Sequence, residues 1–262
     1  MIRALYTAST GLEAQQLNLD TVANNLANVN TTAFKKMRTE FQDLIYQTMK
    51  APGNPGPDGA AQPNQLQVGL GVSPVGTQRL FFQGSLTQTS NPLDLSINGE
   101  GFFMVQGGDG QPRYTRDGTL QIDGQGRLST AQGNLLDPSI QVPNGATNIQ
   151  ISGDGTVTAV LQGQTATTQL GRIETTRFAN PAGLKADGGN LYEPTAASGD
   201  AISGVPGLDG RGLLQQGYLE GSNVQVVEEM VNMIAAQRAF ETNSKVIQSA
   251  DQMLQMANGL KA

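Results

Sequence analysis

The sequence has 262 residues, a formal net charge of −6, and neither cysteine nor histidine. Those two absences exclude disulfides, thiolate nucleophiles, Cys/His zinc sites and histidine-based acid–base catalysis, and the mild negative charge gives no reason to expect nucleic acid or an anionic membrane as a partner. Only 37% of the residues are hydrophobic, and the 33 glycines and 12 prolines are typical of a β-rich protein with many turns rather than of a compact enzyme.

The first 30 residues predict an amphipathic helix with a narrow apolar seam. Its leucines recur at every seventh position, as on one side of a coiled coil, and small or branched residues accompany them: Leu5, Leu12, Leu19 and Leu26, with Ala8, Val22 and Val29. The segment lacks the unbroken apolar run of a secretory signal peptide, so no cleaved leader is expected. No apolar run of about 18 residues occurs anywhere in the chain, so membrane insertion is not expected either.

Asparagines are crowded near the end of this helix, at Asn24, Asn25, Asn28 and Asn30. Asparagine is a mediocre helix former because its amide competes for nearby backbone groups. We therefore expect Asn28 and Asn30 to stop the helix, and helix propensity does not explain the others.

Residues 222–262 predict a second long helix of the same kind. Its larger apolar residues also recur every seven positions, accompanied by small ones: Val226, Met233, Phe240, Ile247 and Leu254, with Ala236, Ala250 and Ala257. Ser222 and Gln225 have the spacing of a capping box, and Glu228 and Glu229 lie where a helix dipole favours acids. We expect the two terminal segments to pair as coiled-coil-like helices.

Outside the seam, both helices carry amide and small side chains, such as Asn24 and Asn243, instead of the usual Lys and Glu. Such faces can pack closely against neighbours and form hydrogen bonds across the contact. The pattern allows two interpretations: a simple helix pair within one molecule, or helices that are surrounded by further copies of the chain. An isolated pair with so thin a seam is marginal in water, which favours the second.

The segments next to the N-terminal helix have a different character. Residues 31–50 show a second helical period, with apolar side chains on one side: Phe34, Met37, Phe41, Leu44 and Ile45. Residues 50–67 then contain four prolines, which exclude a helix interior and a central strand: Pro52, Pro55, Pro57 and Pro63. This Pro/Gly insert is interpreted either as a mobile linker or as an extended segment that is ordered only by contact with a partner.

The middle of the chain, residues 71–192, predicts a small antiparallel β domain, barrel- or sandwich-like. Asp123-Gly124 and Asp154-Gly155 each lie between short apolar runs, which is a hairpin signal. Residues 31–70 and 193–221 connect this domain to the helices. The expected fold class is therefore α+β, with paired terminal helices and an inserted antiparallel β domain.

Few residues could carry chemistry. No phosphate-binding loop or calcium loop is complete, and we expect no cofactor and no metal. A pair of carboxylates can hydrolyse a glycosidic bond without histidine, and Glu100, Asp117 and Asp123 lie in the β region. Solvated or turn-forming carboxylates are the alternative, and one sequence cannot place two of them together.

Long segments at both ends are similar to the terminal motifs of bacterial flagellar rod and hook (axial) proteins: TGLEAQQLNLDTVANNLANVNTTAFKK at 10–36 and GYLEGSNVQVVEEMVNMIAAQRAFETNSKVIQSADQML at 217–254. NGEGFFMV at 98–105 and YTRDGTLQIDGQGRL at 114–128 resemble segments of the same family. The length and the Pro/Gly insert resemble the distal-rod branch of the family more than the hook or proximal-rod branches, which are the alternatives within it.

The resemblance implies a non-enzymatic structural subunit of the flagellar basal body. It implies that the terminal helices form an inner tube, that copies assemble into an open helical shaft in the periplasm, and that the chain leaves the cell through the flagellar export apparatus. Proximal rod and hook subunits and the surrounding ring proteins would be its partners. A secreted β-rich binding protein and a carboxylate-based hydrolase are the hypotheses of other classes.

The resemblance also suggests why the asparagines are present. In a tube, each terminal helix is buried by copies of itself, and polar groups in a buried seam favour one register over others. Asn24 and Asn25 are expected to lie in such an interface. The full expected interface is Leu5, Leu12, Leu19, Asn24, Asn25, Leu26, Asn28, Val226, Met233, Phe240, Asn243, Ile247 and Leu254.

Overall fold

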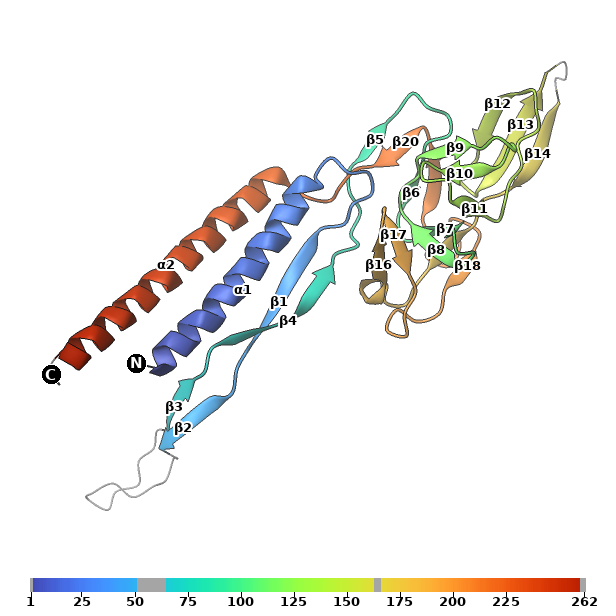
Figure 1. The fold of residues 1–262 in the computed structure, drawn as a ribbon. Coiled ribbons are helices and arrows are strands. Elements are labelled where there is room, and N and C mark those ends of the chain that lie inside the picture. Colours follow the sequence, from blue (N-terminus) through green and yellow to red (C-terminus); the bar gives the residue numbers. More distant parts are fainter. Residues whose placement is uncertain (1, 51–64, 163–165, 260–262) are drawn as a thin grey trace. The chain divides into compact units, whose positions relative to one another are not determined.

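The computed structural model describes residues 2–50, 65–162 and 166–259. The chain folds into two compact units (Figure 1). The helical unit is formed by Met1–Ala27, Met37–Arg79 and Gln225–Ala262, and the β unit by Asn28–Lys36 and Leu80–Val224. The α+β fold with paired terminal helices around an inserted antiparallel β domain is confirmed. The finer division at 30, 70, 192 and 221 stays a prediction.

The helical unit is built on two long helices that lie side by side, α1 (Ile2–Ala27) and α2 (Val226–Gly259) (Figure 1). Small buried side chains let the two backbones approach: Ala8, Ala14, Ala236 and Ala250. At Gly11 the approach is so close that an added Cβ would lie 2.9 Å from the side-chain nitrogen of Asn243. The heptad seam therefore closes the pair within a single chain.

Antiparallel ribbons complete the helical unit along α1. Strand β1 (Met37–Asp43) pairs with β4 (Val72–Arg79), and β2 (Tyr46–Lys50) pairs with β3 (Leu66–Gly69). The prediction of a helix over residues 31–50 is wrong. Thr39, Phe41 and Tyr46 are β-branched or aromatic residues that favour strands, and partner strands distant in sequence supply the hydrogen bonds that a helix would have made locally.

The β unit contains the remaining described strands and one short 3-10 helix. Their bounds are β5 (Leu86–Gln88), β6 (Leu95–Asn98), β7 (Phe102–Gln106), β8 (Pro112–Thr115), β9 (Leu120–Ile122), β10 (Leu128–Thr130), β11 (Leu135–Asp137), β12 (Ala146–Ile151), β13 (Thr156–Leu161), β14 (Thr167–Arg172), β15 (Thr175–Arg177), η1 (Pro181–Gly183), β16 (Lys185–Gly188), β17 (Leu191–Glu193), β18 (Ile202–Gly204), β19 (Leu213–Gln216) and β20 (Tyr218–Glu220).

Within the described part of the β unit, the largest sheet has nine strands. Seven follow the order β16-β17-β8-β7-β11-β10-β9, while β15 pairs with β7 and β18 with β15. Strands β12, β13 and β14 form a further sheet, and β19 pairs with β6 and β20 with β5. The predicted hairpins are confirmed, since Asp123-Gly124 joins β9 to β10 and Asp154-Gly155 joins β12 to β13.

Two apolar clusters stabilise the β unit. The larger one takes buried side chains from several of these sheets and from the loops between them: Leu95, Ile97, Phe103, Val105, Leu120, Leu128, Leu136, Ile140, Val142, Ile151, Val157, Ile173 and Leu214. The smaller one is aromatic, with edge-to-face pairs among Phe81, Phe102, Tyr114, Phe178 and Tyr192. Each cluster thus combines side chains that are distant in the sequence.

Candidate assembly interface

Most residues of the expected interface are partly covered within the chain, and their role between copies stays a prediction. The half-buried members are Leu5, Leu12, Leu19, Leu26, Met233, Asn243, Ile247 and Leu254. Val226 and Phe240 are exposed, at 40% and 36%. Helix α1 is covered by α2 and by the ribbon of β1 and β4, whereas much of the surface of α2 away from α1 is exposed.

Asn25 is the polar centre of the seam and is almost completely buried. Its amide nitrogen donates to the Met37 carbonyl (2.8 Å) and to Glu229 Oε2 (3.1 Å), and its amide oxygen accepts from the Met37 N–H (2.8 Å). One side chain therefore joins α1, β1 and the first turn of α2. Asn24 is exposed on the adjacent surface, and Asn28 lies in the turn after α1, where its side chain accepts from the Thr31 hydroxyl (3.1 Å).

The helix ends follow the predictions only in part. Helix α1 ends at Ala27, directly before Asn28, as expected. Helix α2 begins at Val226, so the predicted capping box at Ser222 is wrong: Ser222 Oγ accepts from the Val224 N–H (3.2 Å) outside the helix. The intervening Asn223 is buried and hydrogen-bonded in the β unit, which prevents a helical start at Ser222.

The four prolines of the insert, Pro52, Pro55, Pro57 and Pro63, lie outside the described residues. Strands β2 and β3 are the described residues on either side of them.

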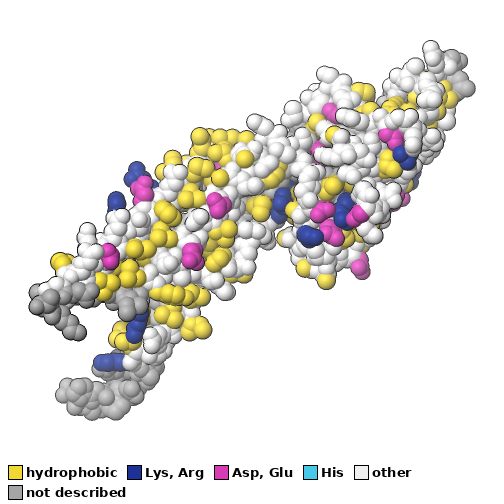
Figure 2. Space-filling view, viewed as in Figure 1, with side chains coloured by type: hydrophobic (Ala, Val, Ile, Leu, Met, Phe, Trp, Pro, Cys, Tyr) yellow, Lys and Arg dark blue, Asp and Glu magenta, His cyan; other side chains and the backbone are white. Residues whose placement is uncertain are grey.

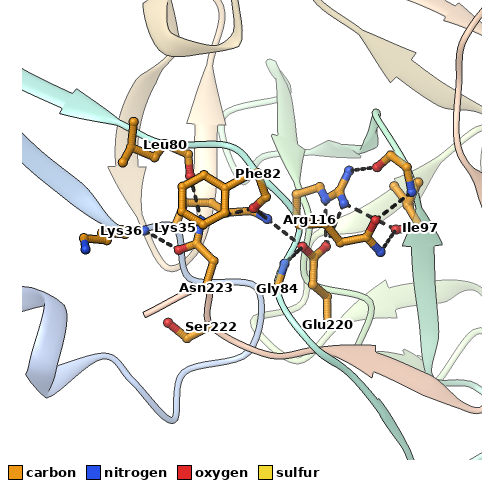
Figure 3. A network of polar contacts seen from close by, with 12 residues as sticks. Lys35, Lys36, Leu80, Phe82, Gly84, Ile97, Arg116, Glu220, Ser222 and Asn223 are labelled. Atoms are coloured by element: carbon orange, nitrogen blue, oxygen red, sulfur yellow. Dashed lines mark hydrogen bonds and ion pairs between the residues drawn. The ribbon is translucent and has the colours of Figure 1, made fainter. Parts of the chain in front are cut away.

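A network of buried ions in the β unit was not predicted from the sequence (Figure 3). The Glu220 carboxylate contacts Lys35 Nζ (2.5 Å) and Arg116 Nε (2.9 Å) and Nη2 (2.8 Å), and it also accepts from the Gly84 N–H (2.9 Å). Lys35 and Glu220 are completely buried. Burial lowers the pKa of Lys35, an effect that the Glu220 carboxylate opposes and the Arg116 cation reinforces. Two cations thus share one carboxylate in a dry environment.

Asn223 extends this network to the positions where the chain passes between the units (Figure 3). Its amide nitrogen donates to the carbonyls of Leu80 (2.8 Å) and Phe82 (3.0 Å), and its amide oxygen accepts from the Lys36 N–H (2.7 Å). The chain leaves the β unit after Lys36, enters it at Leu80 and leaves it again after Val224. Three chain segments are therefore bonded to one another next to these points. Only the fold brings the partners together, so no spacing in the sequence indicates them.

The carboxylates considered for hydrolysis have structural partners. Glu100 is exposed and contacts Arg177 (2.8 Å), and Asp117 accepts from the N–H and hydroxyl of Thr119. The backbone N–H and then the side chain of Arg127, with the Gln125 N–H, hold the pKa of Asp123 below its usual range. Both aspartates have the turn-forming role that was the alternative.

In the part of the chain that the structure describes, no group of three or more His, Cys, Asp or Glu side chains lies close enough together to hold a metal ion. In the same residues, neither helix combines the length and the apolar character needed to cross a membrane.

Comparison with known proteins decides the family. Three protein families match parts of the chain. The family described as "Flagella basal body rod protein" matches residues 5–35, the family described as "Flagellar hook protein FlgE/F/G D1 domain" matches residues 96–159, and the family described as "Flagellar basal body rod FlgEFG protein C-terminal" matches residues 215–260. The flagellar basal-body rod protein FlgG of Borreliella burgdorferi is 49% identical to the chain, over 100% of this chain and 99% of its own length. This chain belongs to the flagellar basal-body rod family.

Other members of the rod family are similarly close. FlgG of Buchnera aphidicola subsp. Acyrthosiphon pisum is 48% identical over 99% of this chain and 100% of its own length, and FlgG of Caulobacter vibrioides is 45% identical over the whole of both chains. The buried ions of this rod protein come from all three matched regions: Lys35 from the first, Arg116 from the second and Glu220 from the third.

Proposed function

We propose that this rod-family chain is the structural subunit of the flagellar distal rod, and that it self-assembles into a rigid, hollow helical shaft. The observation that carries the proposal is its similarity, over the full length, to proteins named flagellar basal-body rod protein FlgG. The shaft would transmit torque and conduct exported subunits, so the role is mechanical and not catalytic. Interfaces between unlike surfaces that do not close into a ring produce such open helical assemblies.

The terminal segments 1–30 and 222–262 are proposed to form the inner tube, with the β unit outside it. Support comes from the two long helices, of which α2 exposes most of the surface that does not face α1. The exposed amide side chains of α2, such as Asn232 and Gln237, are proposed to take part in contacts between copies.

The Pro/Gly insert at 50–67 is proposed to stiffen the shaft by packing on neighbouring subunits. Deletion of residues 50–67 should then leave folding of the monomer intact and make assembled structures curved. Straight assemblies from the deletion variant would count against this role.

The proposed partners are further copies of the chain, proximal rod and hook subunits, the surrounding ring proteins and the export apparatus. The proposed location is the periplasm-spanning rod of the basal body, reached by flagellar export without a cleaved signal peptide. The carboxyl-terminal and amino-terminal matches to rod families are consistent with this placement.

Limited proteolysis with mass spectrometry, on the dilute chain and on sedimented assemblies, tests the proposal. We expect cuts within 1–30 and 225–262 in the dilute chain, resistance of the β unit, and protection of both helices after assembly. Equal protection of the helices in dilute and concentrated samples would argue against assembly through them. Turnover of peptidoglycan by the purified chain would instead support the hydrolase hypothesis.

A further inference from the structure

Helix α2 carries a second apolar surface that does not face α1. Val227, Met230, Val231 and Ile234 are exposed by 75%, 52%, 60% and 58% and have the i, i+3, i+4, i+7 spacing of one helix face. The seam residues Glu229, Met233 and Ala236 lie on roughly the opposite face of the same turns, as a helix with about 3.6 residues per turn requires. We call the four exposed residues the α2 ridge.

The ridge ends sharply along the helix. The residues that continue the same face are charged or amide side chains, Glu241, Lys245 and Gln248, and all are exposed. Apart from the exposed Met256 near the end of α2, the apolar residues of this face lie in the first turns of the helix, which indicates a contact of limited length. Single exposed apolar residues are normal on proteins, but a contiguous set with helical spacing points to an interaction site.

An open groove of about 540 Å³ lies elsewhere on the helical unit, among α1, α2 and β3. Mostly small or apolar residues line it, namely Ala4, Thr7, Ala8, Gly69 and Val246, and Arg3 is the charged lining residue. Small side chains make a groove that can receive the ridge of a helix, as in ridges-into-grooves packing. Figure 2 shows hydrophobic side chains gathered on the surface of the helices.

We propose that the α2 ridge of one copy docks in this groove of the next copy. Charge supports the pairing, because the exposed Glu228 adjoins the ridge and Arg3 lines the groove. The ridge and the groove are different surfaces of one chain, so each copy that binds leaves its own groove free for another. Such a heterologous contact extends without limit and does not close into a dimer.

The positions of the two surfaces also set the direction of growth. The ridge is centred near Val231 and the groove touches α2 near Asn243 and Val246, about 20 Å further along the helix at 1.5 Å per residue. Docking would therefore displace successive copies along the helix axis. This inference rests on the proposed self-assembly and identifies which surfaces meet.

Cysteine cross-linking tests the pairing directly, because the natural chain has no cysteine. The full chain with both Ala4→Cys and Ile234→Cys is concentrated and then oxidised. The two positions lie too far apart along the helix pair to bridge within one chain, since a disulfide needs Cα atoms within about 7 Å. A ladder of linear multimers, with the 4–234 cross-link identified by mass spectrometry, is the expected result.

The control is the chain with Ala4→Cys and Glu241→Cys, which places the second thiol on the polar continuation of the same helix face. It should give no ladder. Dimers alone, cross-linked 234 to 234 or 4 to 4, would show a symmetric contact and overturn the pairing, as would a ladder of equal yield from the control.

Sedimentation separates failure of this inference from failure of the proposed function. If the unsubstituted chain sediments as assemblies but no 4–234 cross-link forms, the pairing is wrong and the assembly role stands. If the unsubstituted chain forms no assembly at any concentration, the proposed pairing and the proposed assembly role are both wrong. Val231→Asp should raise the concentration at which half of the chain sediments about tenfold or more, since one lost aliphatic contact corresponds to roughly that factor in the association constant, whereas Gln248→Asp should not.

Discussion

Replacement of Glu220 by Gln should destabilise the β unit much more than replacement of Lys35 by Met. Glu220 uses one carboxylate oxygen for Lys35 Nζ and the Gly84 N–H, and the other for Arg116. A glutamine amide has one oxygen, so its NH₂ group must face donors on one of these two sides. The variant would lose at least two acceptor contacts and would leave two buried cations without a counter-charge.

The magnitude follows from two independent estimates. Two lost hydrogen bonds to charged groups cost about 3–6 kcal/mol in unfolding free energy, at about 1.5–3 kcal/mol each. Removal of one partner from a buried ion pair costs about 3–5 kcal/mol in measured cases. The two ranges agree, and the loss is a large share of the about 5–15 kcal/mol that stabilises a typical domain.

Lys35→Met is the matched control because it removes one of two cations and leaves the Glu220–Arg116 pair balanced. The Phe82 carbonyl keeps its bond from Asn223 (3.0 Å), and Glu220 keeps the Gly84 N–H. The two lost hydrogen bonds of the ammonium group would cost about 3–6 kcal/mol, but methionine carries no charge to desolvate, which offsets much of this. We expect a net cost of about 1–2 kcal/mol.

Urea unfolding of the full chain measures both variants. Tyr114 and Tyr192 are buried in the aromatic cluster and the chain has no tryptophan, so a near-UV tyrosine signal reports on the β unit. With a slope of about 2 kcal/mol per molar urea, Glu220→Gln should lower the midpoint by about 1.5–2.5 M. A loss below about 1 kcal/mol, or a greater loss in Lys35→Met, would refute the reasoning.

Three further predictions follow from the same structure. Burial lowers the pKa of Lys35, so the folded chain binds that proton less tightly than the unfolded chain. The unfolding free energy of the natural chain, relative to that of Lys35→Met, should therefore rise as the pH increases from neutral toward 10.5. A urea midpoint of the natural chain that falls relative to that of Lys35→Met would contradict this. Asn25→Ala removes three hydrogen bonds and should cost about 2–4 kcal/mol by thermal or urea unfolding, whereas Asn24→Ala, at an exposed position, should change stability by less than about 0.5 kcal/mol. Gly84→Ala would place its Cβ 2.1 Å from the Gly221 carbonyl oxygen and should lower the unfolding free energy by more than about 3 kcal/mol. Gly76→Ala has open space around the added Cβ and should change the unfolding free energy by less than about 1 kcal/mol. Equal urea midpoints for the two variants would show that the loop at Gly84 can move.

The sequence predicted what depends on local pattern. Heptad spacing over many turns identified both terminal helices, because a repeat of that length is produced only by a sustained helical face. Asp-Gly pairs between apolar runs identified two hairpins, because those residues adopt the required turn at low cost. The segment 31–50 shows the limit of such reasoning. Its apolar spacing suits a helix. The strands β3 and β4 that pair with it follow the Pro/Gly insert, so the pairing cannot be seen from neighbouring residues in the sequence.

The tertiary structure decided the rest. Nothing near Asn25 in the sequence shows that it bonds to Met37 and Glu229 within the chain. Its expected place in an interface between copies stays a prediction. In the sequence, nothing distinguishes Lys35, Arg116 and Glu220 from ordinary solvated charges. The fold brings these three residues together from distant segments into one buried site. Local periodicity determines which elements form, but the partner of a buried polar group depends on long-range packing, and a single sequence carries no local signal of it.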